Sequence, residues 1–406
     1  MDQSTTPTIL MARQPIYDRN QKVVAYELLY RSEGEEEHAL FASGSEATSE
    51  VLLNAYTSIS EGGTVKQVPA FVNINKDLLI NSRLPEVSKK QVVFEILEDI
   101  EPGPEVLEAV QRLHKDGYRL ALDDFTYHEK FDPYIELCQI VKVDVTLFNS
   151  SELKQQVQKL NKFRVTLLAE KIETVDKLTE CVELGFRLFQ GHFLSKPEIV
   201  KGKKVQSSHI ALLQLIQELQ KPNATPEKLE KMILRDPALT FKLLRIVNSA
   251  CYHLVRKVES IAQAIVLLGL EQVKKWATLI AMTSNQDKPE ELTRILLIRG
   301  RMCEVIADHD KFPNSSSFFM AGVLSGLHAM LDIDRAEMLE QVPLGDDIKD
   351  AVAMGAGPIG EVLRNVVNYE NGDWDLLPSD LNGNLYDKAY RHSIEWTRET
   401  MQNMYE

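Results

Sequence analysis

Polar residues recur where successive strand-like runs end in the first half of the chain. They are Glu27, Asn73, Glu95, the pair Asp123 and Asp124, Lys142, Glu170 and Gln190. Carboxylate and amide oxygens are the ligands that hard cations such as Mg²⁺ or Mn²⁺ prefer. Adjacent carboxylates are also suited to bridging two such ions, which clamp both oxygens of an in-line phosphate displacement. These residue types therefore indicate a divalent-metal site suited to phosphate chemistry.

Each of these residues, taken singly, also has a plain structural explanation. A glutamate at a strand end is ordinarily a solvated rim residue, and Asn73 is suited to a turn. Asp123 and Asp124 fit a turn or the cap of the next helix equally well. Lys142 is able to pair with Asp144, or with another nearby carboxylate, without doing any chemistry. The argument for a site is joint, because strand after strand ends in the same chemical class.

The segments that position these residues alternate between strand-like and helical patterns. Residues 13–18 and 23–30 form a predicted hairpin across Asp18, Arg19 and Asn20. Further strand-like runs cover residues 70–75, 91–97, 119–125, 140–144, 164–170 and 187–191, and helical patterns cover 47–59 and 104–115. This alternation predicts parallel βα units that close into a TIM-like β/α barrel, in which the strand ends share one face.

The pattern changes after Pro197 and is helical throughout the second half. Residues 200–204 are a predicted linker, and a helix is expected from 208 to 220. Thr225 followed by Pro226 has the pattern of an N-cap residue and a first helical position. Another helix is expected to start at Asp236 and Pro237, and Ser260, Glu271 and Glu290 lie near further expected starts. The second half is therefore predicted to be an all-α domain.

Composition limits the classes of function. A chain of 406 residues fits two domains, here expected at residues 8–199 and 200–406. The net charge of −14, from 60 acidic and 46 basic residues, disfavours general nucleic-acid binding. No apolar stretch approaches the roughly 20 residues that span a bilayer, and the N-terminus lacks the pattern of a signal peptide. No Cys-x-x-Cys pair occurs among Cys138, Cys181, Cys251 and Cys303. We expect a cytoplasmic protein without a membrane partner.

An ordered set of motifs resembles the EAL domain of cyclic-di-GMP phosphodiesterases from about Leu10 to Pro197. The matching segments are Gln14-Pro15-Ile16-Tyr17-Asp18, Glu27-Leu28-Leu29-Tyr30-Arg31, Val72-Asn73-Ile74, Glu95-Ile96-Leu97-Glu98, Asp123-Asp124-Phe125, Lys142-Val143-Asp144, Ala169-Glu170-Lys171-Ile172-Glu173-Thr174 and Gln190-Gly191. Singly these motifs are weak, but they occur in the order of the family. The resemblance implies a β/α barrel of the EAL type.

The resemblance also implies a role for each matching residue. Glu27, Asn73, Glu95 and Asp123 would hold one metal, Mg²⁺ or Mn²⁺, and Asp123, Asp124 and Glu170 would hold or orient a second metal and the attacking water. Lys142 would position and polarise that water, and Gln190 would support the rim. Gln14 and Arg31 would contact cyclic di-GMP, Arg31 through a phosphate oxygen.

The sequence departs from the family pattern at two places. Leu28 stands where the family has alanine. After Phe125 the family continues with Gly-Thr-Gly-Tyr-Ser-Ser, whereas this chain reads Thr126-Tyr127-His128-Glu129-Lys130-Phe131. Because that segment has no glycine, a path with positive φ angles would be strained, and we expect the loop to take another path. Glu98, which anchors the loop in the family, is expected to lose its partner.

The second half resembles the HDOD domain, an all-helical relative of HD phosphohydrolases. The resemblance rests on residues 235–239, 242–250, 260–265 and 267–269. The His-Asp pair of the HD enzymes is absent from Ala321-Gly322-Val323-Leu324-Ser325-Gly326-Leu327-His328. Asp308-His309-Asp310 is expected at a helix end, and Asn248 and Ser249 are expected to cap or bridge helices. We therefore predict a domain that binds partner proteins and does not hydrolyse.

The whole sequence predicts an EAL–HDOD tandem protein of cyclic-di-GMP signalling. The favoured interpretation is a barrel that senses the dinucleotide or a protein, with the helical half passing the state onward and homodimers possible. One alternative is an active phosphodiesterase that yields linear pGpG. The other is a scaffold that binds no nucleotide. Residual Mg²⁺ or Mn²⁺ binding is expected even without turnover, because clustered carboxylates repel one another unless a cation binds.

Overall fold

A computed structural model describes residues 9–32, 68–81, 88–195, 216–217, 219, 225–235, 237–248, 258–283, 288–342 and 344–405. The chain divides into two compact units, residues 1–193 with 370–374 and residues 194–369 with 375–406. The expected helix at 47–59, the linker at 200–204 and most of the helix expected at 208–220 lie outside the described residues. No helix among the described residues is long and apolar enough to cross a membrane.

The first unit contains a closed barrel in the strand order β1 to β8. The strands are β1 (Ile9–Tyr17), β2 (Val23–Ser32), β3 (Ala70–Ile74), β4 (Val92–Ile96), β5 (Arg119–Leu122), β6 (Ile140–Asp144), β7 (Thr166–Glu170) and β8 (Leu188–Phe189). All neighbours from β2 to β8 pair in parallel, whereas β1 is antiparallel to both β2 and β8. The predicted hairpin and the predicted βα barrel are both confirmed.

Apolar side chains fill the interior of the barrel. The buried cluster there consists of Ile16, Ala25, Phe71, Val93, Ala121, Ile140 and Leu168. Side chains two residues apart on a strand point to the same face. The residue two positions after each member on β2 to β7 therefore also points into the barrel, one layer nearer the carboxyl ends of the strands. This layer contains the polar residues singled out from the sequence.

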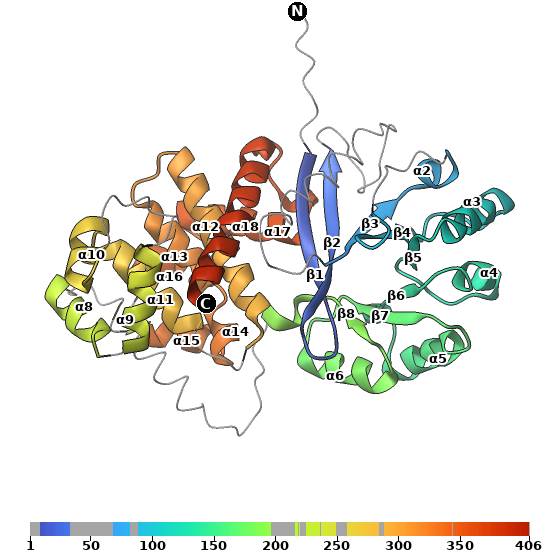
Figure 1. Ribbon diagram of the computed structural model, residues 1–406, viewed down its shortest axis with the longest axis horizontal. Helices are drawn as coiled ribbons and strands as arrows, with labels where there is room; N and C mark the ends of the chain where they lie inside the picture. Colours follow the sequence, from blue (N-terminus) through green and yellow to red (C-terminus); the bar gives the residue numbers. More distant parts are fainter. Residues whose placement is uncertain are drawn as a thin grey trace, which may run out of the picture. The chain divides into compact units, whose positions relative to one another are not determined.

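Helices cover the outside of the barrel (Figure 1). They are α2 (Lys76–Asn81), α3 (Pro104–Lys115), α4 (Asp132–Ile135), α5 (Ser150–Leu160) and α6 (Val175–Leu184). Local sequence determines their ends. Pro104 lies in the first turn of α3, Asn149 forms a capping box with Glu152 at α5, and Gly185 closes α6 in the left-handed conformation.

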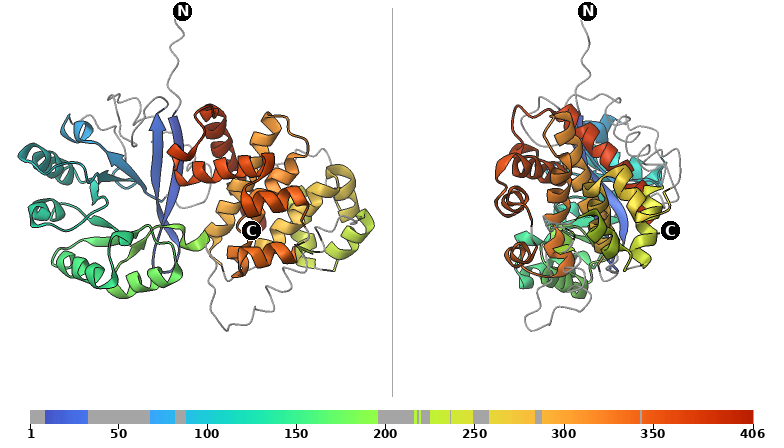
Figure 2. Two further views of the ribbon diagram at one scale, coloured as in Figure 1. Left: turned by 180° about the vertical axis from the view of Figure 1, so that it is seen from behind. Right: turned by 90° about the vertical axis from the view of Figure 1, so that its left-hand side faces the viewer.

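The described residues of the second unit form helices that pack on one another (Figure 2). The helices are α8 (Pro226–Ile233), α9 (Pro237–Val247), α10 (Ile261–Leu268), α11 (Leu270–Thr283), α12 (Glu290–His309), α13 (Ser315–Leu324), α14 (Leu327–Leu331), α15 (Arg335–Gln341), α16 (Asp346–Met354), α17 (Gly357–Asn371) and α18 (Gly383–Tyr405). Thr225 caps α8 as predicted, and Ser260, expected near a helix start, caps α10. The helix α12 packs against α13 and α18, and Gly300 and Gly322 allow the first contact, because a side chain on either would strike the other helix.

Candidate functional site

The polar residues predicted as a site converge on one end of the barrel. Glu27, Asn73, Glu95, Lys142 and Glu170 each follow a member of the interior apolar cluster by two positions. Asp123 continues the ladder beyond β5, because its N–H donates to the Ile96 carbonyl at 3.0 Å. Gln190 does the same beyond β8. Its N–H donates to the Ala169 carbonyl at 2.9 Å, and its carbonyl accepts from the Ile172 N–H at 3.0 Å. The barrel thus assembles side chains that are far apart in the sequence.

The ammonium of Lys142 lies at the centre of this group. Its Nζ is 2.6 Å from Glu95 Oε1, 2.7 Å from Asp123 Oδ1, 2.7 Å from Glu170 Oε1 and 3.4 Å from Glu27 Oε2. The Lys142 side chain is only 1% exposed. One positive charge therefore faces four carboxylates inside the barrel. Of the two pairings that the sequence allowed, Lys142 pairs with other nearby carboxylates, whereas Asp144 pairs with Lys171.

The four carboxylates carry more negative charge than one lysine neutralises. Burial raises the pKa of Glu95 well above its ordinary value, and the nearby Glu27 raises it further. Burial likewise raises the pKa of Glu170. Burial alone would lower the pKa of Lys142, but Asp123, Glu170, Glu27 and Glu95 together raise it well above the ordinary value. The cluster is therefore short of positive charge.

Within the part of the chain that the structure describes, several buried oxygens of the cluster have no hydrogen-bond partner: Asn73 Oδ1, both Glu95 oxygens, Asp123 Oδ1 and Glu170 Oε2. Two of them, Glu95 Oε1 and Asp123 Oδ1, lie close to the Lys142 ammonium as ion pairs. Buried polar atoms are ordinarily satisfied. Carboxylate and amide oxygens with spare lone pairs suit Mg²⁺ or Mn²⁺ in kind. In the described residues, no three histidine, cysteine or acidic side chains are arranged as a metal site.

Gln190 connects two of the predicted residues. Its Nε2 donates to Glu27 Oε2 at 2.6 Å and to Gln14 Oε1 at 2.9 Å. Gly191 follows with φ of +145°, and a Cβ at this position would clash with the backbone of Ile172. Only glycine therefore allows the chain to turn away directly after Gln190. Gln14 lies opposite Glu27 in the register of β1 and β2.

The predicted residue Asp124 pairs with a second lysine and not with Lys142. Asp124 faces Lys171, whose Nζ lies 3.2 Å from Asp124 Oδ1 and 3.1 Å from Oδ2. Arg31 belongs to β2, but its side chain lies outside the described residues, so its predicted phosphate contact stays a prediction.

Sequence reasoning missed the role of Lys171. Its Nζ also lies 2.7 Å from Asp144 Oδ2, so one ammonium joins carboxylates from the ends of β5 and β6. Lys171 and Asp124 both have positive φ angles, +57° and +40°, a conformation uncommon for residues other than glycine. A lysine directly after the predicted Glu170 was the signal available in the sequence, but nothing there indicated its partners.

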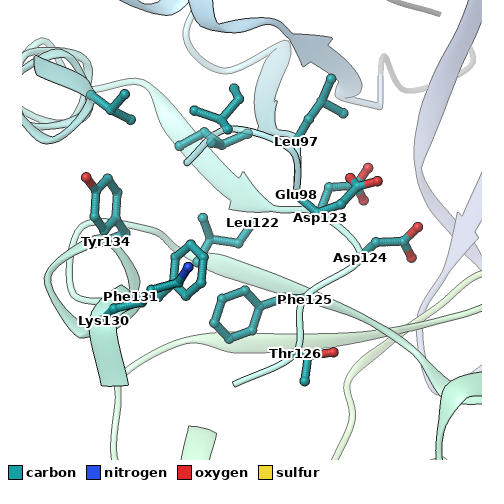
Figure 3. A pocket seen from close by; sticks show the side chains of 13 residues that line it. Leu97, Glu98, Leu122, Asp123, Asp124, Phe125, Thr126, Lys130, Phe131 and Tyr134 are labelled. Carbon is teal, nitrogen blue, oxygen red and sulfur yellow. The ribbon is translucent and has the colours of Figure 1, made fainter. Parts of the chain in front are cut away.

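A pocket of about 270 Å³ adjoins the carboxylates (Figure 3). Leu122, Phe125 and Tyr134 contribute to its apolar wall, and Asp123 and Asp124 lie along one side with Glu98 (Figure 3). Burial, followed by nearby carboxylates, raises the pKa of Glu98 despite a hydrogen bond to its own backbone. The loop after Phe125 contains no positive φ angle between residues 126 and 131 and enters the 3-10 turn at 129–131. Without positive φ angles, the segment does not need the glycines that the family has at these positions.

In the helical unit, the polar residues noted from the sequence make structural contacts. His309 ends α12 and its Nδ1 lies 2.9 Å from Asp310 Oδ1. Asn248 bridges two segments: its Nδ2 donates to the carbonyls of Leu244 and Val258, both at 2.8 Å. Ser325 accepts from Arg299 at 3.0 Å and donates to the Gly322 carbonyl at 2.7 Å. Ser249 lies outside the described residues.

Two family models match this chain. The EAL domain model matches residues 3–197, and the HDOD domain model matches residues 207–341. The protein YuxH of Bacillus subtilis is 32% identical over 410 residues, covering 97% of this chain and 99% of that protein. A Vibrio cholerae protein named cyclic di-GMP phosphodiesterase CdgJ is 33% identical over 377 residues, covering 92% of this chain and 87% of that protein.

Solved structures of EAL proteins are also similar to part of the chain. A calcium and cyclic di-GMP complex of BlrP1 from Klebsiella pneumoniae is 21% identical with a TM-score of 0.37, covering 45% of this chain and 54% of that chain. A complex of the EAL enzyme Bd1971 with cAMP and cyclic di-GMP is 16% identical with a TM-score of 0.38, covering 47% of this chain and 62% of that chain.

Proposed function

Because this chain belongs to the EAL–HDOD family, we propose that its barrel is a metal-dependent phosphodiesterase that acts on cyclic di-GMP. The single observation that carries the proposal is the geometry around Lys142. Three carboxylates, from β4, from the residue directly after β5 and from β7, lie within 2.7 Å of its Nζ, with Glu27 of β2 at 3.4 Å. The relative CdgJ, named a cyclic di-GMP phosphodiesterase, matches nearly the whole chain.

The proposed reaction is hydrolysis of one phosphodiester bond. A water oxygen bonds to phosphorus, the bond from phosphorus to the ribose 3′ oxygen breaks, and a proton reaches that oxygen, which leaves linear pGpG. A divalent cation at the carboxylates would supply positive charge to the phosphate oxygens and activate the water. Glu27, Asn73, Glu95 and Asp123 would hold the ion.

The chain's own residues do the remaining work in this proposal. Lys142, whose raised pKa keeps its ammonium charged, orients the attacking water and stabilises negative charge on the phosphate. Glu170, 2.7 Å from that ammonium, accepts a hydrogen bond from the water. Gln190 keeps Glu27 in place through its 2.6 Å hydrogen bond. Gln14 and Arg31 contact the dinucleotide.

Binding without hydrolysis is the second candidate function. It is favoured by the segment from Thr126 to Phe131, which lacks the glycines of the family loop and forms a 3-10 turn over residues 129–131. A barrel with this loop would sense cyclic di-GMP and transmit its presence. The helical unit would then pass the state to a protein partner, which stays a prediction from the sequence, as does a homodimer.

One assay separates the two functions. The purified full chain is incubated with Mn²⁺ and cyclic di-GMP, and both linear pGpG and bound dinucleotide are measured, beside Glu27→Ala. We expect product from the wild type and a loss of at least about 100-fold in the variant, the size of effect typical for a removed catalytic group. Binding without product supports the sensor. Neither binding nor product contradicts both and leaves the non-nucleotide scaffold.

A further inference from the structure

The ammonium of Lys171 lies where a cation joining Asp124 and Asp144 would lie. We propose that Lys171 is a built-in counter-ion that takes the place of one divalent cation at the barrel mouth, so that the protein binds a single such ion there. This inference rests on the proposed function in one respect, namely that the carboxylates around Lys142 bind a divalent cation. It concerns how many ions bind and which residue limits that number.

The Lys171 ammonium donates hydrogen bonds to the carboxylates of both Asp124 and Asp144. Its Nζ lies 2.7 Å from Asp144 Oδ2 and within 3.2 Å of both oxygens of Asp124. The remaining Asp144 oxygen, Oδ1, accepts from the N–H and the hydroxyl of Thr146 at 2.8 and 2.6 Å. Every carboxylate oxygen of this pair therefore already has a donor. A second divalent ion would have to displace the ammonium from Asp124.

Both residues of this ion pair have an unfavourable backbone conformation. Lys171 has φ of +57° and Asp124 has φ of +40°, a left-handed conformation that is unfavourable for residues other than glycine. Strained residues persist where the surroundings determine them strongly and cluster at functional sites. Here the two strained residues are joined directly by the ion pair. The geometry is therefore that of a positioned contact between the ends of β5 and β7.

The charge balance separates the two lysine clusters at the mouth. One ammonium faces four carboxylates around Lys142, a surplus of three negative charges when all are ionised. One ammonium faces the two carboxylates Asp124 and Asp144, a surplus of only one. A divalent cation gains more from the first cluster, which also contains the buried oxygens without hydrogen bonds. The single ion is therefore expected at Glu27, Asn73, Glu95 and Asp123.

The test counts bound Mn²⁺ on the full chain without nucleotide. Isothermal titration calorimetry and the paramagnetic resonance signal of free Mn²⁺ each give a stoichiometry. We expect one ion for the wild type and two for Lys171→Gly, since glycine removes the ammonium and tolerates the positive φ. Lys171→Arg, which keeps the charge, is expected to bind one ion. Lys154→Met, a change of an exposed lysine on α5, is the control and is expected to bind one.

A second variant keeps the test valid if Lys171→Gly does not fold, as judged by circular dichroism. Asp124→Asn in the wild-type background is expected to retain one ion, because Lys171 and not a metal occupies Asp124. Two ions in the wild type, or a lost ion in Asp124→Asn, would overturn the inference and leave the proposed function intact. No ion in any of the proteins would contradict the metal-dependent part of the proposed function, and the inference with it.

Discussion

Each unit of the molecule buries a lysine among charged side chains, and the two clusters differ in their balance of charge. In the barrel, Lys142 faces four carboxylates. In the helical unit, Lys275 Nζ lies 2.6 and 2.8 Å from the two oxygens of Glu304, and Arg301 Nη1 lies 2.7 Å from Glu304 Oε2. The barrel cluster is therefore deficient in positive charge, whereas in the helical cluster two cations contact one carboxylate and Asp308 adds a further negative charge that acts on Lys275.

The side chains around the two clusters also differ, because aromatic rings lie next to the cations of the helical cluster. Lys275 lies 3.5 Å from the centre of the Phe319 ring, and the Arg301 guanidinium lies 5.4 Å from that of Trp396. Aromatic faces stabilise cations, so the extra positive charge there has partners within the protein. Among the described residues, the buried polar atoms without a hydrogen-bond partner also differ in kind: they are carboxylate and amide oxygens in the barrel cluster and Arg301 Nε in the helical cluster. The barrel cluster therefore suits a further cation, whereas the helical cluster does not.

The largest expected effect comes from removing the barrel lysine. Lys142→Met leaves four buried carboxylates without their cation, and we expect a loss of up to about 5 kcal/mol of unfolding free energy in metal-free buffer. Mn²⁺ at about 100 times its Kd is expected to stabilise each protein that binds it by about 2.7 kcal/mol. The variant lacks the competing ammonium, so it is expected to bind Mn²⁺ more tightly than the wild type and to gain more at the same Mn²⁺ concentration. Differential scanning calorimetry with and without Mn²⁺ measures both. A loss that Mn²⁺ does not reduce would contradict the comparison, and Lys154→Met is the control.

The corresponding substitution in the helical unit is expected to cost less unfolding free energy, and Mn²⁺ is not expected to reduce that loss. Glu304→Gln leaves Lys275 and Arg301 without a carboxylate in a buried site, which costs about 3 kcal/mol. Denaturant unfolding followed by the fluorescence of Trp276 and Trp396 reports on this unit. Stabilisation of the variant by Mn²⁺ would show that the two clusters do not differ as described. Glu340→Gln, at an exposed position on α15, serves as the matched control.

The smallest expected effect is a difference in pH dependence. Burial lowers the pKa of Lys275 to about 8 although Glu304 raises it, whereas an unfolded lysine has a pKa of about 10.4. Between these values the unfolded chain binds more protons than the folded one, so wild-type stability rises with pH. We expect the unfolding free energy of the wild type, relative to that of Lys275→Met, to rise by about 1 kcal/mol per pH unit from pH 8 to 10.

The barrel lysine is expected to behave in the opposite way. Because the folded pKa of Lys142 is raised, its contribution is fully present below about pH 10.4 and is lost only above that value. The unfolding free energies of Lys142→Met and the wild type should therefore keep a constant difference between pH 8 and 10. Parallel denaturant titrations of both variants at each pH provide the measurement. A rising difference for Lys142 would indicate that its carboxylates do not stabilise the ammonium.

Much of the fold follows from local sequence. The alternation of strand-like and helical segments predicts the barrel, and Thr225 and Ser260 cap helices where the sequence indicates. The antiparallel pairing of β1 with β8 is not evident from the local sequence pattern. It joins Tyr17 to Phe189, two residues far apart in the sequence, and therefore depends on how the whole barrel closes.

By itself, the sequence determined which oxygen-bearing residues end the strands, since a repeat of two places them on the inner face next to apolar residues such as Val93 and Ala121. Only the tertiary structure decided how their charges are shared. Whether Lys142 faces one carboxylate or four, and whether Lys171 reaches Asp124 and Asp144, depends on the curvature of the closed barrel and on two positive φ angles. Electrostatic energies depend on distances between groups remote in sequence, which residue types alone do not specify.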